Sequence, residues 1–358
     1  MADCVVRFVT NREEVKGKIP FGSGLNQKSP LYLRYGAARV ALPQGKQKDY
    51  VLKSVAVAPE VMPGIDAPLN TQAKFGSSQV YAELQAELIS NNADLLIFLH
   101  GFACDFATAI LRAAELKHRW STPERPLEVA VFSWPADGRM VPFLNYSSDR
   151  DDARSSAKAI ARALHRLVEN FRALDQARRD AIKNRQAPPP FCGARLHLVA
   201  HSMGNYALRN AFQALRSDMG GKVPRLFDTI FLMAADEDND AFEDEGKFMH
   251  LPDLAHSVHV YFAQNDGALI ISDTTKMHPD RLGTTGPRTL SNLPQKVTLV
   301  DCANVASTAS VSEASHQYYR QRPEVIADVQ AVLAGQVPDQ IANRDFVPNK
   351  RAFRIRPK

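Results

Sequence analysis

Short apolar segments recur along most of the chain with stretches of helical character between them, and this alternation restricts the possible folds more than composition does. Residues 95–100 (LLIFLH) are apolar on both faces, as in a central parallel strand. Comparable runs lie at 129–134, 195–200, 227–234, 257–263 and 296–302. Strands that alternate with helices in this way form a doubly wound, mostly parallel sheet with helices on both faces. We therefore predict an α/β domain built on such a sheet.

The helices expected between these strands are long enough to cover a sheet. They are predicted at 80–90, 106–119, 149–183, 206–217 and 323–333. The segment 149–183 is predicted to be one long helix, because Ser148 can act as its N-cap and acidic residues fill its first turn. The proline run at 188–190 then separates it from the next strand.

The first 75 residues have a different pattern. Strands rich in β-branched residues are predicted at 4–10, 38–42 and 50–57, with polar segments that contain glycine and proline between them. We predict a β-rich extension over residues 1–75 that packs on a catalytic domain at 76–338. Residues 339–358 are expected to form a basic C-terminal tail.

The net charge of +5 owes much to that tail, which contains Lys350, Arg351, Arg354, Arg356 and Lys358. A short basic end is usually solvated, and no helix-turn-helix, zinc knuckle or RNA-binding aromatic pattern accompanies it, so no nucleic-acid partner is expected. No segment reaches the roughly 18–20 apolar residues of a membrane span, and the first residues lack a signal-peptide pattern. We expect a cytoplasmic protein without integral membrane association. The oligomeric state stays open.

The cysteines do not indicate a metal site. Cys4, Cys104, Cys192 and Cys302 include no C-x-x-C pair, and no cysteine–histidine cluster has zinc-ligand spacing. Free thiols are consistent with a reducing compartment. We therefore predict neither a metal nor an organic cofactor.

The stretch LHLVAHSMGNYALRNAF at 196–212 carries the strongest functional signal. An apolar strand leads to Ser202, Gly204 follows two residues later, and a helix begins there. A serine on such a sharp strand-to-helix turn has small neighbours and an exposed hydroxyl, as in the G-x-S-x-G elbow of α/β hydrolases, although Ala200 replaces the first glycine. The alternative is a serine that caps an ordinary helix. The small flanking residues favour an α/β-hydrolase fold with Ser202 as the nucleophile.

A serine nucleophile needs donors for the oxyanion that forms on the substrate. His100 and Gly101 follow the strand at 95–100, where this fold places its second amide donor. We predict the backbone N–H groups of Phe102 and Met203 as the two donors, with Gly101 allowing close approach to the substrate. The alternative is a turn that uses glycine for its geometry alone.

The general base is expected after the last strand, because these enzymes order the triad as serine, acid, histidine. His316 satisfies that order, since it follows the strand at 296–302 and precedes the final helix. His278 is the reserve candidate.

Two aspartates compete for the role of the acid that orients the histidine. Asp266 follows the strand at 257–263, and Asp236 follows the strand at 227–234. Both are strand-end positions that this fold uses. We prefer Asp266 and keep Asp236 as the alternative.

Aromatic residues near these motifs can form an apolar substrate pocket. Phe106, Trp134 and Tyr146 are the candidates for substrate binding, together with Gly101. The alternative for the aromatic residues is that they belong to the hydrophobic core.

Taken together, these segments resemble a bacterial family of α/β hydrolases known as domain of unknown function 900. The resemblance runs from about residue 5 to 335 and includes VRFVTNR, LLIFLHGF, VFSWPADG, LVAHSMGNYAL, FLMAADEDNDAF, VYFAQNDGALIISD and SHQYY. It implies an esterase-like serine hydrolase that uses Ser202, His316 and one of the two aspartates, with Trp134 and Asp137 at the rim of the site. The sequence departs from the family at Ala200 and at the Ala-Ala pair before Asp236, where relatives often have Ala-Pro.

We therefore predict a serine hydrolase of the carboxylesterase or lipase type, which cleaves a small-molecule carboxylic ester through an acyl-enzyme intermediate. Amide or thioester cleavage, or acyl transfer on the same triad, remains an alternative. A catalytically silent binding scaffold is the third possibility, because a fold does not fix a function.

Overall fold

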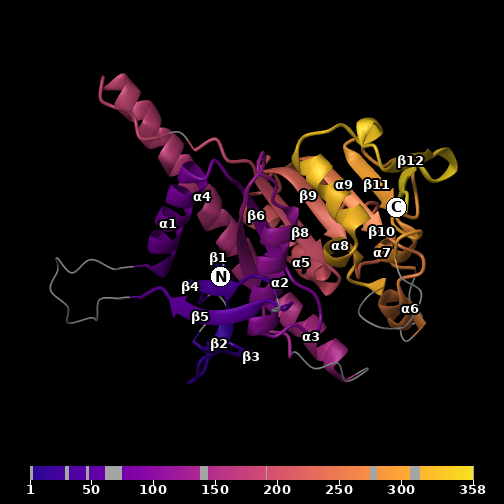
Figure 1. Ribbon diagram of the computed structural model, residues 1–358, viewed down its shortest axis with the longest axis horizontal. Helices are drawn as coiled ribbons and strands as arrows, with labels where there is room; N and C mark the ends of the chain where they lie inside the picture. Colours follow the sequence, from indigo (N-terminus) through magenta and orange to yellow (C-terminus); the bar gives the residue numbers. More distant parts are fainter. Residues whose placement is uncertain are drawn as a thin grey trace.

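The computed structural model describes residues 3–28, 32–45, 48–60, 75–137, 144–190, 192–274, 280–306 and 315–357. An 11-stranded sheet runs through the molecule (Figure 1). Its strands are β1 (Asp3–Thr10), β4 (Arg34–Ala41), β5 (Val51–Val57), β6 (Asp94–Leu99), β7 (Leu127–Ser133), β8 (Leu196–His201), β9 (Phe227–Met233), β10 (Ala255–Phe262), β11 (Val297–Asp301), β12 (Arg344–Val347) and β13 (Ala352–Ile355). The two short strands β2 (Arg12–Glu14) and β3 (Phe21–Leu25) form a separate hairpin.

The sheet has the order β12-β13-β11-β10-β9-β8-β6-β7-β1-β4-β5. Neighbouring strands are parallel from β13 through to β1. Within the described part of this sheet, antiparallel pairs occur only at its two ends, where β12 pairs with β13 and β1–β4–β5 form a meander. The mostly parallel sheet predicted from the sequence is therefore confirmed.

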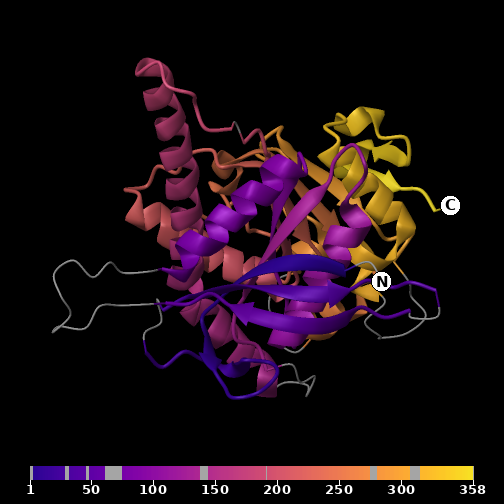
Figure 2. The ribbon, with the colours of Figure 1, turned by 60° about the vertical axis from the view of Figure 1, so that its left-hand side comes forward.

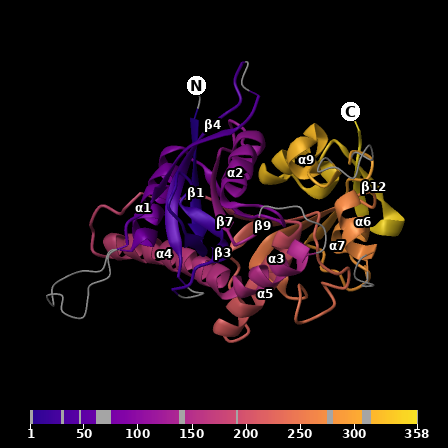
Figure 3. The ribbon, with the colours of Figure 1, turned by 90° about the horizontal axis from the view of Figure 1, so that it is seen from below.

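Helices cover both faces of this sheet. They are α1 (Gly76–Ser90), α2 (Phe106–Trp120), α3 (Leu144–Ser155), α4 (Ala157–Lys183), α5 (Met203–Asp218), α6 (Gly267–Thr274), α7 (Leu282–Thr285), α8 (Tyr318–Gln321) and α9 (Pro323–Leu333). Helices α1, α4 and α5 contribute to the core on one face, and α2, α8 and α9 contribute to the core on the other (Figure 3). No helix within the described ranges is both long and apolar enough to cross a membrane.

Strand β6 shows why the apolar runs form the centre of the sheet. All six of its residues are buried. Successive side chains point to opposite faces, so Leu95, Ile97 and Leu99 join the core beneath α1, α4 and α5. Leu96 and Phe98 join the core beneath α2 and α9. A strand buried on both faces needs the continuous apolar run that the sequence contains.

The segment predicted as one helix at 149–183 is two helices, and that prediction was wrong in two respects. Helix α3 already begins at Leu144, so Ser148 lies within it and is not an N-cap. The break between α3 and α4 falls at Ser156, a buried residue whose Oγ accepts a hydrogen bond from Asn11 Nδ2 at 2.9 Å. The far part of α4 projects from the body of the molecule (Figures 1 and 2).

The N-terminal strands extend the central sheet. Residues Arg7–Thr10 of β1 pair in parallel with Ala130–Ser133 of β7. The other edge of β1 pairs with β4, and β4 pairs with β5 (Figure 2). The N-terminal β-rich region predicted from the sequence is thus present and is continuous with the sheet.

The C-terminal basic segment forms two strands of the sheet, which differs from the tail expected there. Strand β13 pairs with β11, and β12 pairs with β13. The Arg344 guanidinium is buried and bonds both carboxylate oxygens of Asp328 at 2.7 Å. Arg354 pairs with Asp301 at 3.1 Å. The sequence did not predict these strands, because nothing local shows that their arginines pair with Asp328 and Asp301 earlier in the chain.

Candidate active site

The predicted site residues converge because the parallel strands end at one edge of the sheet. Gly101 follows β6, Ser202 follows β8, Asp236 follows β9 and Asp266 follows β10. His316 follows β11 at a greater distance along the chain. The carboxyl ends of parallel strands are the usual location of ligand sites in open α/β sheets.

Ser202 occupies a strained turn between β8 and α5. Its φ is 53° and its ψ is −127°, a positive φ that is uncommon for a residue other than glycine. The backbone is held there by the Ser202 N–H, which donates to Met233 O at 3.0 Å. The Ser202 carbonyl accepts from the N–H groups of Asn205 and Asp236 at 2.9 and 3.2 Å.

Gly204 makes the close approach of α5 to the sheet possible. A Cβ at this position would lie 2.4 Å from Leu99 O and 2.6 Å from His100 O. Any side chain here would displace either the helix or the end of β6. The second glycine of the elbow motif is therefore required by packing.

Asn205 supports the same turn and was not singled out by sequence reasoning. Its buried Nδ2 donates to Ala200 O and Ser202 O, both at 3.1 Å. An asparagine in the first turn of a helix is common, so its sequence signal is weak. Its contribution is to fix the backbone carbonyls of Ala200 and Ser202.

The structure brings His316 and Asp266 together. His316 Nδ1 lies 2.8 Å and 3.0 Å from the two carboxylate oxygens of Asp266. Asp266 is fully buried and His316 is 8% exposed, so this pair is shielded from water. The hydrogen bond places the proton of the neutral imidazole on Nδ1 and leaves Nε2 as the basic nitrogen.

His201, the residue before Ser202, contacts His316. His201 Nε2 lies 3.0 Å from His316 O, and the two rings are 4.7 Å apart between centroids. Burial lowers the pKa of His201 well below its usual value, and the nearby His316 lowers it further. His201 is therefore neutral. Its ring connects the turn at Ser202 to His316. Within the described ranges no hydrogen bond joins the Ser202 hydroxyl to His316.

Asp236, the alternative acid, has other partners. Its carboxylate accepts a hydrogen bond from the Tyr146 hydroxyl and lies 3.4 Å from Arg281 Nε. It is 2% exposed and sits beside Ser202, because its N–H donates to Ser202 O. The reserve base, His278, lies outside the described residues.

The loop after β6 lies directly against Ser202. A Cβ at Gly101 would lie 2.8 Å from Ser202 Cβ, so only glycine fits this contact. In this part of the structure neither the Phe102 amide nor the Met203 amide donates a hydrogen bond to another described residue. Both predicted donors are therefore free to bind an oxyanion.

Two aromatic residues expected to bind substrate are instead part of the protein interior. Trp134 is fully buried, stacks on His100 with ring centroids 4.9 Å apart, and donates its Nε1–H to His100 O at 2.9 Å. Phe106 is 1% exposed and packs on Phe8 and Phe21. We expected both residues to face the substrate and Trp134 to lie at the rim of the site. The structure corrects this, because neither side chain has surface that a ligand could contact.

Tyr146 and Asp137 remain accessible. Both are partly exposed, and the Tyr146 ring lies 5.7 Å from that of Phe102. The Asp137 N–H donates to Asp149 Oδ1 at 3.1 Å. Tyr146 therefore stands between the loop after β6 and Asp236, next to the elbow.

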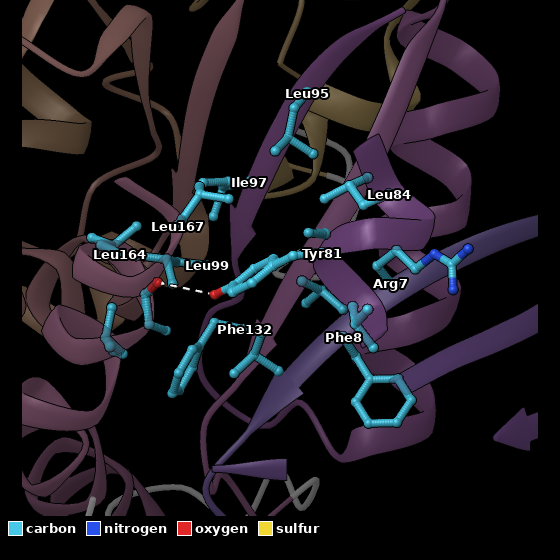
Figure 4. A pocket seen from close by; sticks show the side chains of 16 residues that line it. Arg7, Phe8, Tyr81, Leu84, Leu95, Ile97, Leu99, Phe132, Leu164 and Leu167 are labelled. Carbon is cyan, nitrogen blue, oxygen red and sulfur yellow. Dashed lines mark hydrogen bonds between the residues drawn. The ribbon is translucent and has the colours of Figure 1, made fainter. Parts of the chain in front are cut away.

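An apolar cavity lies elsewhere, between the sheet and helices α1 and α4 (Figure 4). Its lining includes Tyr81, Leu84, Ile97, Leu99 and Leu164. Its volume is about 40 Å³, whereas a cavity of roughly 150 Å³ is needed to hold benzene. The cavity is too small for an acyl chain and is a packing gap in the core.

The described residues contain no group of three or more His, Cys, Asp or Glu side chains that could hold a metal ion.

Comparisons with known proteins place the chain among hydrolases of this fold. A family model described as alpha/beta hydrolase of unknown function (DUF900) matches residues 77–175 and 184–335. No curated protein matches the sequence. Among solved structures, a proposed cell surface hydrolase from Lactobacillus plantarum WCFS1 is similar at 13% sequence identity, with a TM-score of 0.31. That match covers 70% of this chain and 95% of the other.

Proposed function

Because this chain belongs to the DUF900 family of α/β hydrolases, we propose that it cleaves carboxylic esters with Ser202 as nucleophile, His316 as general base and Asp266 as the acid that orients the base. The observation that carries the proposal is the buried His316–Asp266 pair beside a serine in a strained turn. A carboxylate bound to Nδ1 fixes the tautomer that a general base needs.

The first chemical step is attack on the ester carbonyl. Ser202 Oγ forms a bond to the carbonyl carbon while its proton moves to His316 Nε2. The carbonyl π electrons move to oxygen, and this oxyanion accepts hydrogen bonds from the Phe102 and Met203 amides. We infer that the hydrogen bond from Ser202 Oγ to His316 Nε2 forms when substrate binds, since catalytic hydrogen bonds often tighten only then.

Collapse of the tetrahedral intermediate releases the alcohol. His316 gives its proton to the leaving oxygen, and the acyl group remains on Ser202. Water then attacks the acyl-enzyme with His316 again as base, and the carboxylic acid leaves. No step calls for a metal or an organic cofactor, because each proton and charge has a partner in the protein.

The amide donors contribute much of the expected acceleration. Loss of a single oxyanion donor in a comparable enzyme costs roughly 10²–10³ in kcat. The donors proposed here are backbone groups on two different segments, the loop after β6 and the start of α5. Gly101 and Tyr146 border the same region and are the residues we assign to contact with a small ester substrate.

The test is hydrolysis of p-nitrophenyl esters from acetate to palmitate by wild type and by Ser202→Ala. We expect wild type to turn over part of the series and Ser202→Ala to lose activity by roughly 10⁶-fold, as removal of a triad serine does elsewhere. The best chain length then reports the size of the acyl site. Comparable turnover by both proteins would contradict the assignment of Ser202.

A fluorophosphonate probe and two further substrates separate the alternatives. Labelling of Ser202 together with turnover of p-nitroanilides or thioesters, but not of esters, would replace the esterase proposal with amide or thioester cleavage. Labelling of a different serine would reject the site. Absence of both labelling and turnover would favour a binding scaffold.

A further inference from the structure

Two buried side chains of opposite charge, Arg12 and Asp149, take no part in the mechanism above yet each contacts the same two loops. One is the Gly101 loop, residues 100–105, which follows β6. The other is the Trp134 loop, residues 133–137, which begins at the last residue of β7. Both side chains have no exposed surface. Arg12 belongs to β2 and Asp149 to α3, so they approach the loops from different elements.

Arg12 ties the two loops together through neutral acceptors. Its Nη2 donates to Cys104 O in the Gly101 loop at 2.7 Å. Its Nε donates to Ser133 Oγ at 2.9 Å and its Nη1 to Ala136 O at 3.2 Å, both in the Trp134 loop. A further bond from Nη1 to Gly22 O at 3.1 Å anchors the guanidinium to the β2–β3 hairpin.

The burial of Arg12 is costly, and this cost indicates a specific role. No carboxylate within the described ranges forms an ion pair with it. Burial lowers the pKa of Arg12 to about 10. A lysine could not replace it, because only the planar guanidinium directs several donors in fixed directions at once.

Asp149 makes the matching contacts with backbone N–H groups. One carboxylate oxygen accepts from the Ala103 amide at 3.1 Å, and the other accepts from the Asp137 amide at 3.1 Å. The Ala103 bond matters for conformation, because Ala103 has a φ of 50° in the left-handed region that L-residues seldom adopt. Burial raises the pKa of Asp149 to about 6.

The bonds from the two side chains fall immediately after the predicted oxyanion donor. Gly101, before Phe102, lies so close to Ser202 that a Cβ on it would come within 2.8 Å of Ser202 Cβ. Ala103 and Cys104, after Phe102, are fixed by Asp149 and Arg12. The direction of the Phe102 N–H therefore depends on a loop that is held on both sides.

We propose that Arg12 and Asp149 are positioning residues that together hold the Phe102 amide where the oxyanion forms, and that the N-terminal β1–β2 segment is thereby part of the catalytic apparatus. The proposal rests on the esterase function proposed above. Two further hydrogen bonds connect the β1–β2 segment to the end of β7 and to the residue between α3 and α4. Thr10 Oγ1 donates to Ser133 O at 2.6 Å, and Asn11 Nδ2 donates to Ser156 Oγ at 2.9 Å.

The test uses Arg12→Lys and Asp149→Asn in the full chain, with the best p-nitrophenyl ester as substrate. We expect kcat to fall by roughly 10–100-fold and KM to stay within about threefold, because a misplaced donor weakens transition-state binding more than substrate binding. A trifluoromethyl ketone, which forms an oxyanion on the serine, should lose affinity in proportion to kcat/KM. A purely structural role would not produce that proportionality.

The matched controls come from another buried arginine and another buried aspartate, Arg344 and Asp328, which form an ion pair with each other. Arg344→Lys and Asp328→Asn should lower the thermal midpoint but leave kcat within about twofold. Unchanged kcat in folded Arg12→Lys and Asp149→Asn would overturn the proposal, as would a change confined to KM. If Arg12→Lys does not fold, Asp149→Asn decides the question.

A second readout separates failure of this proposal from failure of the esterase proposal. If wild type hydrolyses no ester, the esterase proposal fails, and amide hydrogen exchange then tests the loop contacts alone. Faster exchange at Ala103 and Asp137 in Asp149→Asn than in Asp328→Asn would support the role of Asp149 in holding the loops. Equal exchange at both amides would overturn that role at any level of activity.

Discussion

At the scale of single residues, the candidate site contains two aspartates near Ser202, and their surroundings differ. Asp266 accepts from His316 Nδ1 through a fully buried contact. Asp236 accepts from Tyr146 and lies near Arg281. The sequence left the choice between them open because both follow parallel strands and therefore reach the same edge. Only the partners of each carboxylate distinguish them.

Asp266→Asn tests the assignment of the acid. We expect kcat for ester hydrolysis to fall by roughly 10⁴-fold, because an amide in place of the carboxylate favours the wrong tautomer of His316. Steady-state kinetics at neutral pH measure the change. Asp236→Asn serves as the comparison and should lower kcat far less, since its carboxylate bonds Tyr146 and lies beside Arg281. The opposite order would transfer the role of acid to Asp236.

Glu237 gives a pH prediction. It is 1% exposed, its Oε1 accepts from Arg209 at 2.8 Å, and its Oε2 has no hydrogen-bond partner among the described residues. Burial raises the pKa of Glu237 to about 7. The folded state therefore holds a proton that the unfolded chain releases near pH 4.5, so the stabilisation is present below that pH and is lost as pH rises through 7.

We expect the free energy of unfolding of wild type, relative to Glu237→Gln, to fall by up to about 3 kcal/mol between pH 4.5 and 7.5. Urea unfolding at several pH values measures this difference. Glu243→Gln is the control, because that carboxylate pairs with Arg288 at the surface and its pKa is lowered. Its difference curve should be flat over the same window. An equally flat curve for Glu237→Gln would contradict the raised pKa.

Residue-level sequence reasoning succeeds where the signal is local. Gly204 and Gly101 could be recognised as site residues because each belongs to a short motif at the end of a strand. The structure shows that both make close contacts there. Trp134 was placed wrongly because an aromatic residue after a strand can turn into the core or toward solvent, and the sequence does not say which. Arg12 and Asp149 could not be found, because their partners are mainly backbone groups of distant loops.

At the scale of elements, the central strands were predictable because burial on both faces demands a continuous apolar run. The short strands β12 and β13 carry charged residues, so no such run marks them. The division of α3 from α4 also escaped prediction. Helical periodicity continues across Ser156, and the break coincides with a buried bond from Asn11, more than a hundred residues earlier.

The packing of α1 on the sheet is tested by Leu84→Ala. Leu84 is 3% exposed and borders the cavity of about 40 Å³. Its truncation enlarges an existing gap, so we expect a loss of about 3–5 kcal/mol in the free energy of unfolding, with kcat unchanged. Urea denaturation measures the loss. Ile182→Ala on α4 is the control, since Ile182 is 57% exposed and its change should cost little. A loss under about 1 kcal/mol for Leu84→Ala would show that the helix collapses to fill the gap.

At the scale of the whole molecule, the sheet joins both ends of the chain to the catalytic core. Strands β1, β4 and β5 extend it on one side, and β13 and β12 on the other. The boundaries predicted at residues 75 and 338 separate regions of different composition, yet hydrogen bonds of one sheet run across both of them. Composition reports the local environment of a segment and not its partners.

A chain that ends at Ile341 tests the contribution of the C-terminal strands. It lacks β12, β13 and Arg344, which leaves the buried carboxylate of Asp328 without its guanidinium and exposes an edge of β11. We expect the free energy of unfolding to fall by at least about 3–5 kcal/mol, the usual effect of breaking a buried ion pair. Adding Asp328→Asn should recover part of the loss. Equal stability of the full and shortened chains would show that these strands are dispensable.

The position of β1 has a consequence for the order in which the protein folds as it leaves the ribosome. Strand β1 lies between β4, which follows it closely, and β7, whose Ser133 pairs with Thr10. The antiparallel meander can form early, but the second edge of β1 must wait for about 120 more residues. At roughly 5–20 residues per second, that edge stays unpaired for about 6–25 s. During this interval it offers unsatisfied backbone groups to any neighbouring nascent chain, so misassembly during synthesis should depend on how quickly β7 emerges.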